Sequence, residues 1–331
     1  VFSTPYVVTQ KPETIRQLMK DRVKGYHMRQ FNSLNLLPRS GVFLSEGDHW
    51  RLNRKAAEPA LSESSADSMV PIMTQMAKRM VNIVSTLADP SGIIDNWVPH
   101  QWFRRCTLDF TVATHFGEDY NLQNTLDMRR DKEREIAHKA VQGWMDAIDY
   151  VFKHIYLAPI MQDRYPFKLN RSVAEFYSCK KAVVQYSEKI INERTAELKA
   201  GATPKTNVLD KLLNMHKGDL TWNLVTFILA GSASASATME WFVYLMPENW
   251  FLPGTTEINR DLARDHWAFS CGPRKCPGQT LAVKECTIIA AFLLRHFDDI
   301  RFTLGYDDVK ETMWLNRVPE NLRVTMSLRN Y

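Results

Sequence analysis

The chain has 331 residues, of which 45% are hydrophobic and 24% are charged, and its formal net charge is +5. This balance is typical of a soluble globular chain with a sizeable core. The small positive excess is compatible with an acidic partner or an anionic membrane surface but more often has no specific meaning, and we expect no nucleic-acid partner. The five cysteines are odd in number and mostly far apart. They exclude the dense, even disulfide framework of small secreted proteins and favour a reducing compartment.

The beginning of the chain gives the first expectation about its organisation. It opens VFSTPYVVTQ, without an initiator Met, a charged n-region or the apolar h-region of a signal peptide. We therefore expect the sequence to be the interior of a longer protein, with any membrane anchor lying upstream and not present in this chain.

Hydrophobic periodicity predicts mostly helices. Apolar and charged positions alternate with a helical period over residues 62–88, 128–150 and 171–200. Gly201 follows the last of these segments as a C-cap. Only two short segments, residues 6–8 and 322–328, have the composition of strands. The sequence thus predicts a mainly α fold with a small β component.

One long stretch, residues 220–239 (LTWNLVTFILAGSASASATM), carries no charged residue. It is long enough to span a bilayer, but it contains Asn223, three Thr and three Ser, and it lacks flanking clusters of Lys and Arg. A helix buried through the centre of a large α domain gives the same pattern, and we favour that interpretation. Asp219 stands where it can cap the N-terminus of this helix.

The segment from Phe269 to Gly278, FSCGPRKCPG, carries the most specific chemistry in the chain. Cys276 offers a thiolate, and Pro277 suits the first turn of the amphipathic helix predicted to follow. A thiolate at a helix N-terminus is stabilised by the macrodipole and the free N–H groups. Taken alone, Cys276 has two other interpretations, which are half of a zinc site together with Cys271 and an inert buried thiol.

Six positions of this segment fit one ordered pattern, F-x-x-G-x-R-x-C-x-G, which resembles the haem-loop signature of the cytochrome P450 superfamily. The resemblance implies that Cys276 is the axial thiolate ligand to the iron of haem b (iron protoporphyrin IX). It implies that Arg274 pairs with a haem propionate and that Phe269 shields the sulfur from water. Gly272 and Gly278 would let the backbone pass close to the flat macrocycle.

Residues 47–61, GDHWRLNRKAAEPAL, resemble the C-helix of the same superfamily, with its W-x-x-x-R pair. Trp50 and Arg54 are one helical turn apart, so both side chains are expected to donate to haem propionates as a second clamp. The alternative is a packed cation–π pair between the two side chains.

The uncharged stretch resembles the central I-helix, whose A-G-x-D/E-T pattern appears here at residues 230–234. Gly231 would leave room for O2 over the iron, and Ser234 keeps the hydroxyl where the family usually has Thr. Ala233 replaces the usual acid, so either Ser232, Ser236 and waters deliver protons, or O–O cleavage is impaired. The alternative for Ser234 is a hydroxyl bonded back to the preceding turn.

The largest departure from the superfamily concerns the E-x-x-R pair of the K-helix, which should lie between the I-helix and the haem loop. Only 22 residues, 247–268, lie there. Residues 247–250 resemble the P-E-R-W meander, and residues 257–260 spell E-x-x-R after it, in the wrong place, which we interpret as a coincidence. We therefore expect one fragmentary cytochrome P450 domain over residues 1–331, with an incomplete fold and an apparent deletion at the 246/247 junction.

The resemblance implies a haem-thiolate monooxygenase that inserts one oxygen atom of O2 into an apolar small molecule. Residues 108–120, LDFTVATHFGEDY, resemble fungal alkane and fatty-acid hydroxylases of the superfamily, which suggests a long-chain alkane or fatty acid as substrate. The alternative is a degenerate, non-catalytic relative that lacks the core needed for turnover.

The same resemblance implies an electron source and a location. Electrons would come from NADPH through an NADPH–cytochrome reductase, at the cytosolic face of the endoplasmic reticulum membrane. Lys275 and Lys284 near the ligand would meet an acidic surface of that reductase, or they are ordinary solvated lysines.

Overall fold

The computed structural model describes residues 9–21, 40–124, 171–215, 217–246, 268–303, 309–313 and 316–329. Four expectations lie outside the described residues: the strand at 6–8, the helix at 128–150, the meander-like residues 247–250 and the E-x-x-R at 257–260.

The fold is mainly α with a small β component, as the sequence predicts. The helices are α1 (Pro12–Asp21), α2 (Gly41–Leu44), α3 (Gly47–Ala60), α4 (Glu63–Ser85), α5 (Pro99–Phe116), α7 (Arg171–Lys199), α8 (Val208–Leu212), α9 (Lys217–Leu245) and α10 (Gln279–His296). The strands are β1 (Ile93–Trp97), β2 (Phe297–Phe302), β3 (Lys310–Met313), β4 (Arg317–Glu320) and β5 (Val324–Leu328).

Helix boundaries follow local capping chemistry. Ser62 precedes α4, and its hydroxyl accepts a hydrogen bond from the Ser65 N–H. α5 ends at Gly117, which has the left-handed φ of 75° that favours glycine. The expected cap at Gly201 is confirmed, because this residue has φ 93° and its N–H donates to the Leu198 carbonyl at 3.1 Å.

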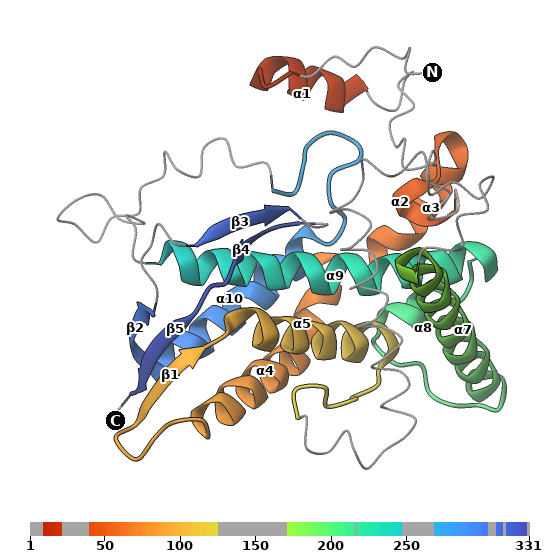
Figure 1. Ribbon diagram of the computed structural model, residues 1–331. Helices are drawn as coiled ribbons and strands as arrows, with labels where there is room; N and C mark the ends of the chain where they lie inside the picture. Colours follow the sequence, from red (N-terminus) through yellow and green to blue (C-terminus); the bar gives the residue numbers. More distant parts are fainter. Residues whose placement is uncertain are drawn as a thin grey trace.

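The uncharged stretch forms most of α9, which runs through the middle of the molecule in Figure 1. Leu224, Ile228 and Val243 are fully buried, and α9 packs against α5, α7 and α10. These contacts confirm the interpretation of a buried helix. Within the described ranges, no helix is both long and apolar enough to cross a bilayer.

A single apolar core supports α9 from the side of α4 and α5. Met69, Met73, Met76 and Met80 recur at helical spacing along α4 and are all buried. Met side chains fill irregular gaps well, and here they pack in one cluster with residues of α5 and α9.

The strands in the described part of the chain form two small antiparallel sheets. One has the order β1-β5-β2, and the other is the pair β3-β4. β5 lies within the predicted segment 322–328, so that expectation is confirmed. α9 reaches the second sheet through Trp241, whose indole N–H donates to the Arg317 carbonyl at 2.8 Å.

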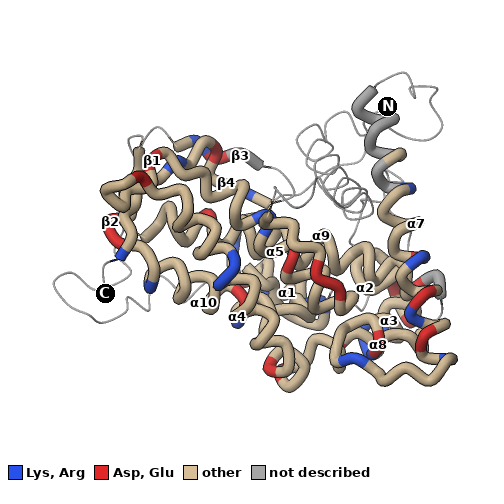
Figure 2. Tube along the Cα trace, turned by 90° about the horizontal axis from the view of Figure 1, so that it is seen from below, with Lys and Arg blue, Asp and Glu red and all other residues tan. Residues whose placement is uncertain are grey.

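Charges of both signs are interspersed along the chain in Figure 2, in agreement with the small net charge. Several are paired, including Lys284 with Asp67 at 2.8 Å and Arg79 with Asp119.

Candidate functional site

The loop at residues 268–278 leads directly into α10 and is held by its own backbone. The Cys276 N–H donates to the Phe269 carbonyl at 2.9 Å, and the Lys275 N–H donates to the Gly272 carbonyl at 3.0 Å. Gly278 is the N-cap residue of α10. Pro277 therefore lies just before the helix and not in its first turn, and α10 begins one residue after the start at Gly278 that the sequence predicts.

The Cys276 thiol is partly buried at the end of this loop. Burial raises its pKa, while the Gly278 N–H and the positive charge of Arg54 act in the opposite direction without outweighing burial. In the protein by itself the group is therefore a thiol at neutral pH. A coordinated metal cation reverses that balance, because a coordinating thiol is deprotonated.

The two glycines of the loop have different surroundings. Gly272 has φ +75°, and a Cβ there would lie 2.5 Å from the backbone oxygen of Met19 in α1. The backbone of Gly272 thus approaches α1 closely, and its expected approach to a macrocycle stays a prediction. A Cβ on Gly278 would have one near neighbour among the described atoms, the Cys276 sulfur at 4.0 Å, so the backbone beside the sulfur is open.

Arg274 and Trp50, predicted from separate motifs, come together in the fold. The Arg274 guanidinium carbon lies 4.3 Å from the Trp50 ring centroid, and Nη2 donates to the Ser45 carbonyl at 2.8 Å. Trp50 is 5% exposed. The indole thus stacks on a cation, but the cation is Arg274 of the loop and not Arg54 of the same helix.

Arg54 points toward the loop backbone. Its Nη1 donates to the Lys275 carbonyl at 2.7 Å, and its Nε donates to Glu58 at 2.6 Å. Arg54 therefore ties α3 to the residue that precedes Cys276.

The zinc interpretation of Cys271 and Cys276 has no support in the part of the chain that the structure describes. There, no group of three or more His, Cys, Asp or Glu side chains could hold a metal ion.

One face of the buried helix α9 is exposed. Ala230, Ser234 and Thr238 recur at every fourth position, and all three are exposed. Both hydroxyls bond back to the preceding turn, Ser234 to the Ala230 carbonyl and Thr238 to the Ser234 carbonyl. In Figure 1 the loop before α10 lies on the α1 side of α9, and α5 lies on the other side.

Ser232 and Ser236 lie on the opposite side of α9, because residues two apart on a helix are about 200° apart. Both are buried. The Ser232 hydroxyl bonds back to the Ile228 carbonyl at 2.6 Å, and the Ser236 hydroxyl bonds to Glu240 at 3.1 Å. Neither hydroxyl therefore lies on the face of α9 that carries Ser234.

Gly231 faces α5. A Cβ there would lie 3.3 Å from Oγ1 and 3.4 Å from Cγ2 of Thr111. Close packing of α9 on α5 accounts for this glycine, and the room for O2 beside it stays a prediction.

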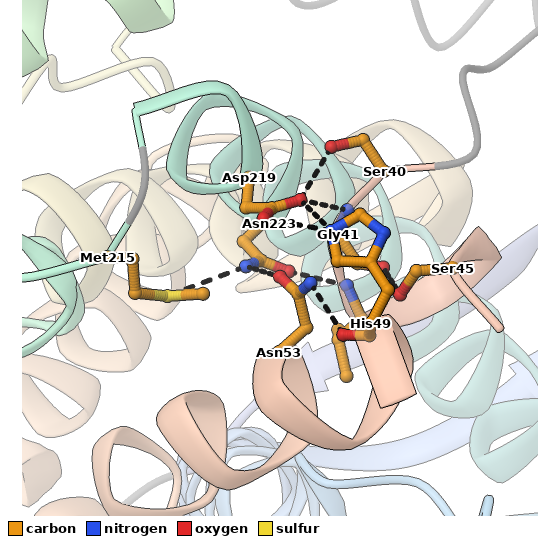
Figure 3. Close-up of polar contacts among 9 residues, drawn as sticks. Ser40, Gly41, Ser45, His49, Asn53, Met215, Asp219 and Asn223 are labelled. Atoms are coloured by element: carbon orange, nitrogen blue, oxygen red, sulfur yellow. Dashed lines mark hydrogen bonds and ion pairs between the residues drawn. The ribbon is translucent and has the colours of Figure 1, made fainter. Parts of the chain in front are cut away.

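The sequence did not reveal a polar cluster at the start of α9, drawn in Figure 3. The Asp219 carboxylate accepts from His49 at 2.8 Å and from the Ser40 hydroxyl at 2.7 Å. Burial by itself raises the pKa of Asp219, but these hydrogen bonds outweigh burial and lower it to about 2. Asp219 lies in the first turn of α9, and it also accepts from Gly41 N–H at 3.3 Å, at the start of α2. Two signals were in the sequence: Asn223, a polar residue in an apolar run, and Asp219, which we expected to cap the helix and which lies in its first turn because α9 begins at Lys217.

The site residues fit a haem in three respects. The thiol of Cys276 is the donor that a haem-thiolate centre requires. The backbone at Gly278 is open beside the sulfur, and Arg274 and Trp50 supply donors that suit propionate carboxylates.

Sequence comparison identifies relatives of the chain. A family model described as Cytochrome P450 matches residues 1–250. "Cytochrome P450 94A1" of Vicia sativa is 22% identical over 255 residues, which cover 73% of this chain and 47% of that protein. "Cytochrome P450 72A397" of Kalopanax septemlobus is 24% identical over 278 residues, covering 77% and 49% respectively. The chain spans about half the length of the curated relatives it matches.

Solved structures with the same fold are also found. The heme domain of cytochrome P450DA has a TM-score of 0.73 at 14% identity, covering 97% of this chain and 87% of that one. Cytochrome P450 (CYP102L1) has a TM-score of 0.70 at 16% identity, with coverage of 96% and 91%. The shared fold agrees with the family model, which matches well over half of the chain. This chain therefore belongs to the cytochrome P450 family.

Proposed function

We propose that this chain is a haem-thiolate monooxygenase in which Cys276 binds the iron of haem b. One observation carries the proposal: a partly buried thiol ends a backbone-braced loop directly before a helix, with open backbone beside its sulfur at Gly278. When bound, haem supplies the activation of O2 that allows one oxygen atom to be inserted into an organic substrate. The family match ends at residue 250, so the role of Cys276 rests on its own geometry and motif.

The chain's own residues have distinct tasks in this proposal. Cys276 would hold the iron through its sulfur as the thiolate, and the bond from its N–H to the Phe269 carbonyl orients the residue. Arg274 and the Trp50 indole N–H hold propionate oxygens. Arg54 holds the loop through the Lys275 carbonyl and also pairs with Glu58, and a propionate would be its third acceptor.

The exposed face of α9 lies on the substrate side. Ser234 offers a hydroxyl there, and Ala230 leaves space beside it. Gly231 supports this face indirectly, because it lets α9 pack closely on α5. Since Ala233 supplies no carboxyl group and Ser232 and Ser236 face away, we assign the proton donation near Ser234 to its hydroxyl with water.

The substrate that we propose is a long-chain alkane or fatty acid. Support comes from the resemblance of residues 108–120 to alkane and fatty-acid hydroxylases, and this segment lies in α5 and the turn after it. The test is product analysis with laurate and hexadecane. Hydroxylated products support the assignment, and their absence from a preparation that oxidises another apolar compound contradicts it.

The electron source that we propose is NADPH through an NADPH–cytochrome reductase, at the cytosolic face of the endoplasmic reticulum membrane. Lys275 is exposed and next to the ligand, whereas Lys284 is paired with Asp67. Lys275→Glu is therefore expected to weaken reductase binding more than Lys284→Glu. Equal reductase affinity in wild type and Lys275→Glu contradicts this docking.

A second candidate is a degenerate relative that does not turn over. Two observations favour it: Ala233 stands in place of an acid, and only 22 residues, 247–268, lie between the helix that resembles the I-helix and the loop that carries Cys276. We keep the proposal that residues 1–331 form one domain, because one core cluster includes residues from α2 through β5.

The difference spectrum of the reduced, carbon-monoxide-treated chain supplied with haem separates the two candidates. The strongly red-shifted band of a thiolate-bound complex, retained in Cys271→Ser and lost in Cys276→Ser, supports a working site. Absence of that band in the wild-type chain favours the degenerate relative.

A further inference from the structure

Asn223 lies in the second turn of α9, is fully buried, and joins three segments (Figure 3). Its Oδ1 accepts from the Val42 N–H in α2 at 2.7 Å. Its Nδ2 donates to Asn53 Oδ1 in α3 at 2.8 Å and approaches the Met215 sulfur at 3.6 Å. Asn53 Nδ2 in turn donates to the His49 carbonyl at 3.0 Å. Each amide has one workable orientation in this chain of bonds.

α2 is fitted closely onto this amide. Gly41 has φ +71°, and a Cβ there would lie 3.1 Å from Asn223 Oδ1 and 3.2 Å from Asn223 N. The Gly41 N–H also donates to Asp219 at 3.3 Å. α2 is therefore anchored to α9 at two successive N–H groups, those of Gly41 and Val42.

The other end of α2 reaches the loop that carries Cys276. The N–H and hydroxyl of Ser45 both donate to the Gly41 carbonyl, and Ser45 is buried. The Ser45 carbonyl accepts from Arg274 Nη2 at 2.8 Å. A continuous series of hydrogen bonds thus runs from Asn223, through α2 and Ser45, to Arg274.

We propose that Asn223 is a positioning residue for the loop at 268–278: by holding α2 it fixes the Ser45 carbonyl, which orients the Arg274 guanidinium against Trp50. The inference rests on the proposed function, because that function assigns Arg274 to a haem propionate and so makes its orientation important. The hydrogen bonds of Asn223 in the described residues reach α2 and α3 but not the loop itself. It therefore acts through α2, and its bond to Asn53 also holds α3, which carries Trp50.

The test is a double-mutant cycle of Asn223→Asp and Arg274→Gln in the full chain. Asn223→Asp keeps the acceptor for the Val42 N–H but places a carboxylate oxygen against Asn53 Oδ1, so α2 and α3 can no longer both be held. The measurement is hydrogen exchange at the loop amides of Lys275 and Cys276 without added haem. Each single substitution is expected to speed exchange by on the order of threefold to tenfold, and the double variant should be no faster than the faster single one.

Asn207→Asp is the matched control, because Asn207 is another buried Asn whose Oδ1 accepts from Asp210 N–H in α8 and does not reach the loop. It should leave loop exchange unchanged, alone or with Arg274→Gln. Unchanged loop exchange in Asn223→Asp, or effects that multiply with those of Arg274→Gln, overturns the proposal. If Asn223→Asp speeds exchange throughout α4 and α5, it has unfolded the chain. Asp219→Asn then replaces Asn223→Asp in the cycle, because it weakens the hydrogen bonds from Ser40 and Gly41 to this side chain and leaves Asn223 in place. The same criteria apply.

The same variants supplied with haem separate this inference from the proposed function. A non-additive exchange result without a thiolate-type carbon-monoxide band in wild type supports the positioning role and contradicts haem-thiolate function. A thiolate-type carbon-monoxide band in wild type, together with exchange effects that are additive or absent, supports the haem-thiolate function and contradicts the positioning role.

Discussion

The side chain of Thr111 on α5 occupies the space beside Gly231 on α9, where a Cβ would lie 3.3 Å from its hydroxyl oxygen. Nearby, the Thr107 hydroxyl donates to the Ser232 carbonyl at 3.0 Å. α5 therefore sets the position of the α9 turn whose other face carries Ala230 and Ser234.

Gly231→Ala is expected to destabilise the chain, because the added methyl group must push α9 away from Thr111. Overpacking of this kind costs about 1–3 kcal/mol in the free energy of unfolding. Thr111→Ala removes both atoms that crowd the new methyl, so the double variant should regain more than half of the loss. Denaturant unfolding of the two single variants and the double variant measures this, and purely additive losses would show that the two residues are not in contact.

Arg274→Lys should weaken haem retention while leaving the fold intact. A lysine ammonium cannot reproduce the planar stacking on Trp50 together with a directed bond to the Ser45 carbonyl. We expect haem to dissociate roughly tenfold faster, which corresponds to about 1.4 kcal/mol. Transfer of haem to an excess of an acceptor protein gives the rate. Arg51→Lys is the control, since Arg51 is exposed on α3 and pairs with Asp48, and an equal effect of both substitutions would contradict the assignment.

Ser234→Ala and Ser232→Ala form a matched pair on one helix. Both hydroxyls bond back to a carbonyl four residues earlier, but Ser234 is exposed and Ser232 is fully buried on the α5 side. Ser234→Ala should lower the ratio of organic product to hydrogen peroxide formed per NADPH consumed, because proton delivery on that face is lost. Ser232→Ala should leave the ratio unchanged. A larger change in Ser232→Ala would place the proton donor on the other side of α9.

His115 should make the chain sensitive to mild acid. It is buried beside Phe227, and burial lowers its pKa to about 4, although its bond to the Thr111 carbonyl acts in the opposite direction. Between the ordinary value of 6.5 and about 4, the unfolded chain binds a proton that the folded chain does not bind. Stability should therefore fall as pH decreases through this window, by up to about 3 kcal/mol.

His115→Gln should remove this part of the pH dependence while lowering stability at neutral pH. The measurement is the free energy of unfolding between pH 7 and pH 4 in both proteins. An equally steep decline in the variant would assign the acid sensitivity to other groups.

Local signals predicted much of the fold. The helical period gave α4 and α7 to within a few residues, and Gly201 ends α7 as expected. The polar residues within the uncharged stretch, and the lack of Lys and Arg clusters beside it, predicted that α9 is buried in the domain and does not span a bilayer. These features depend on neighbours in sequence, so periodicity and capping chemistry suffice to predict them.

Partners across the fold were harder to predict. The sequence paired Trp50 with Arg54, whereas the fold stacks Trp50 on Arg274 and turns Arg54 toward the Lys275 carbonyl. The sequence predicted that Gly231 and Gly272 face a cofactor, and the fold also packs Gly231 against α5 and Gly272 against α1, contacts that the sequence did not predict. A glycine indicates that another part of the structure packs closely against the backbone, but the sequence does not identify that neighbour.

By itself the sequence determined the family, the mainly α class, the central buried helix and the candidate thiolate at Cys276, because each depends on residue type at fixed spacing. Only the tertiary structure decided which face of α9 is exposed, where Ser232 and Ser236 point, and how Asn223 is linked to Arg274. Those relationships join residues far apart along the chain, and the packing of whole helices, not local spacing, fixes their distance and direction.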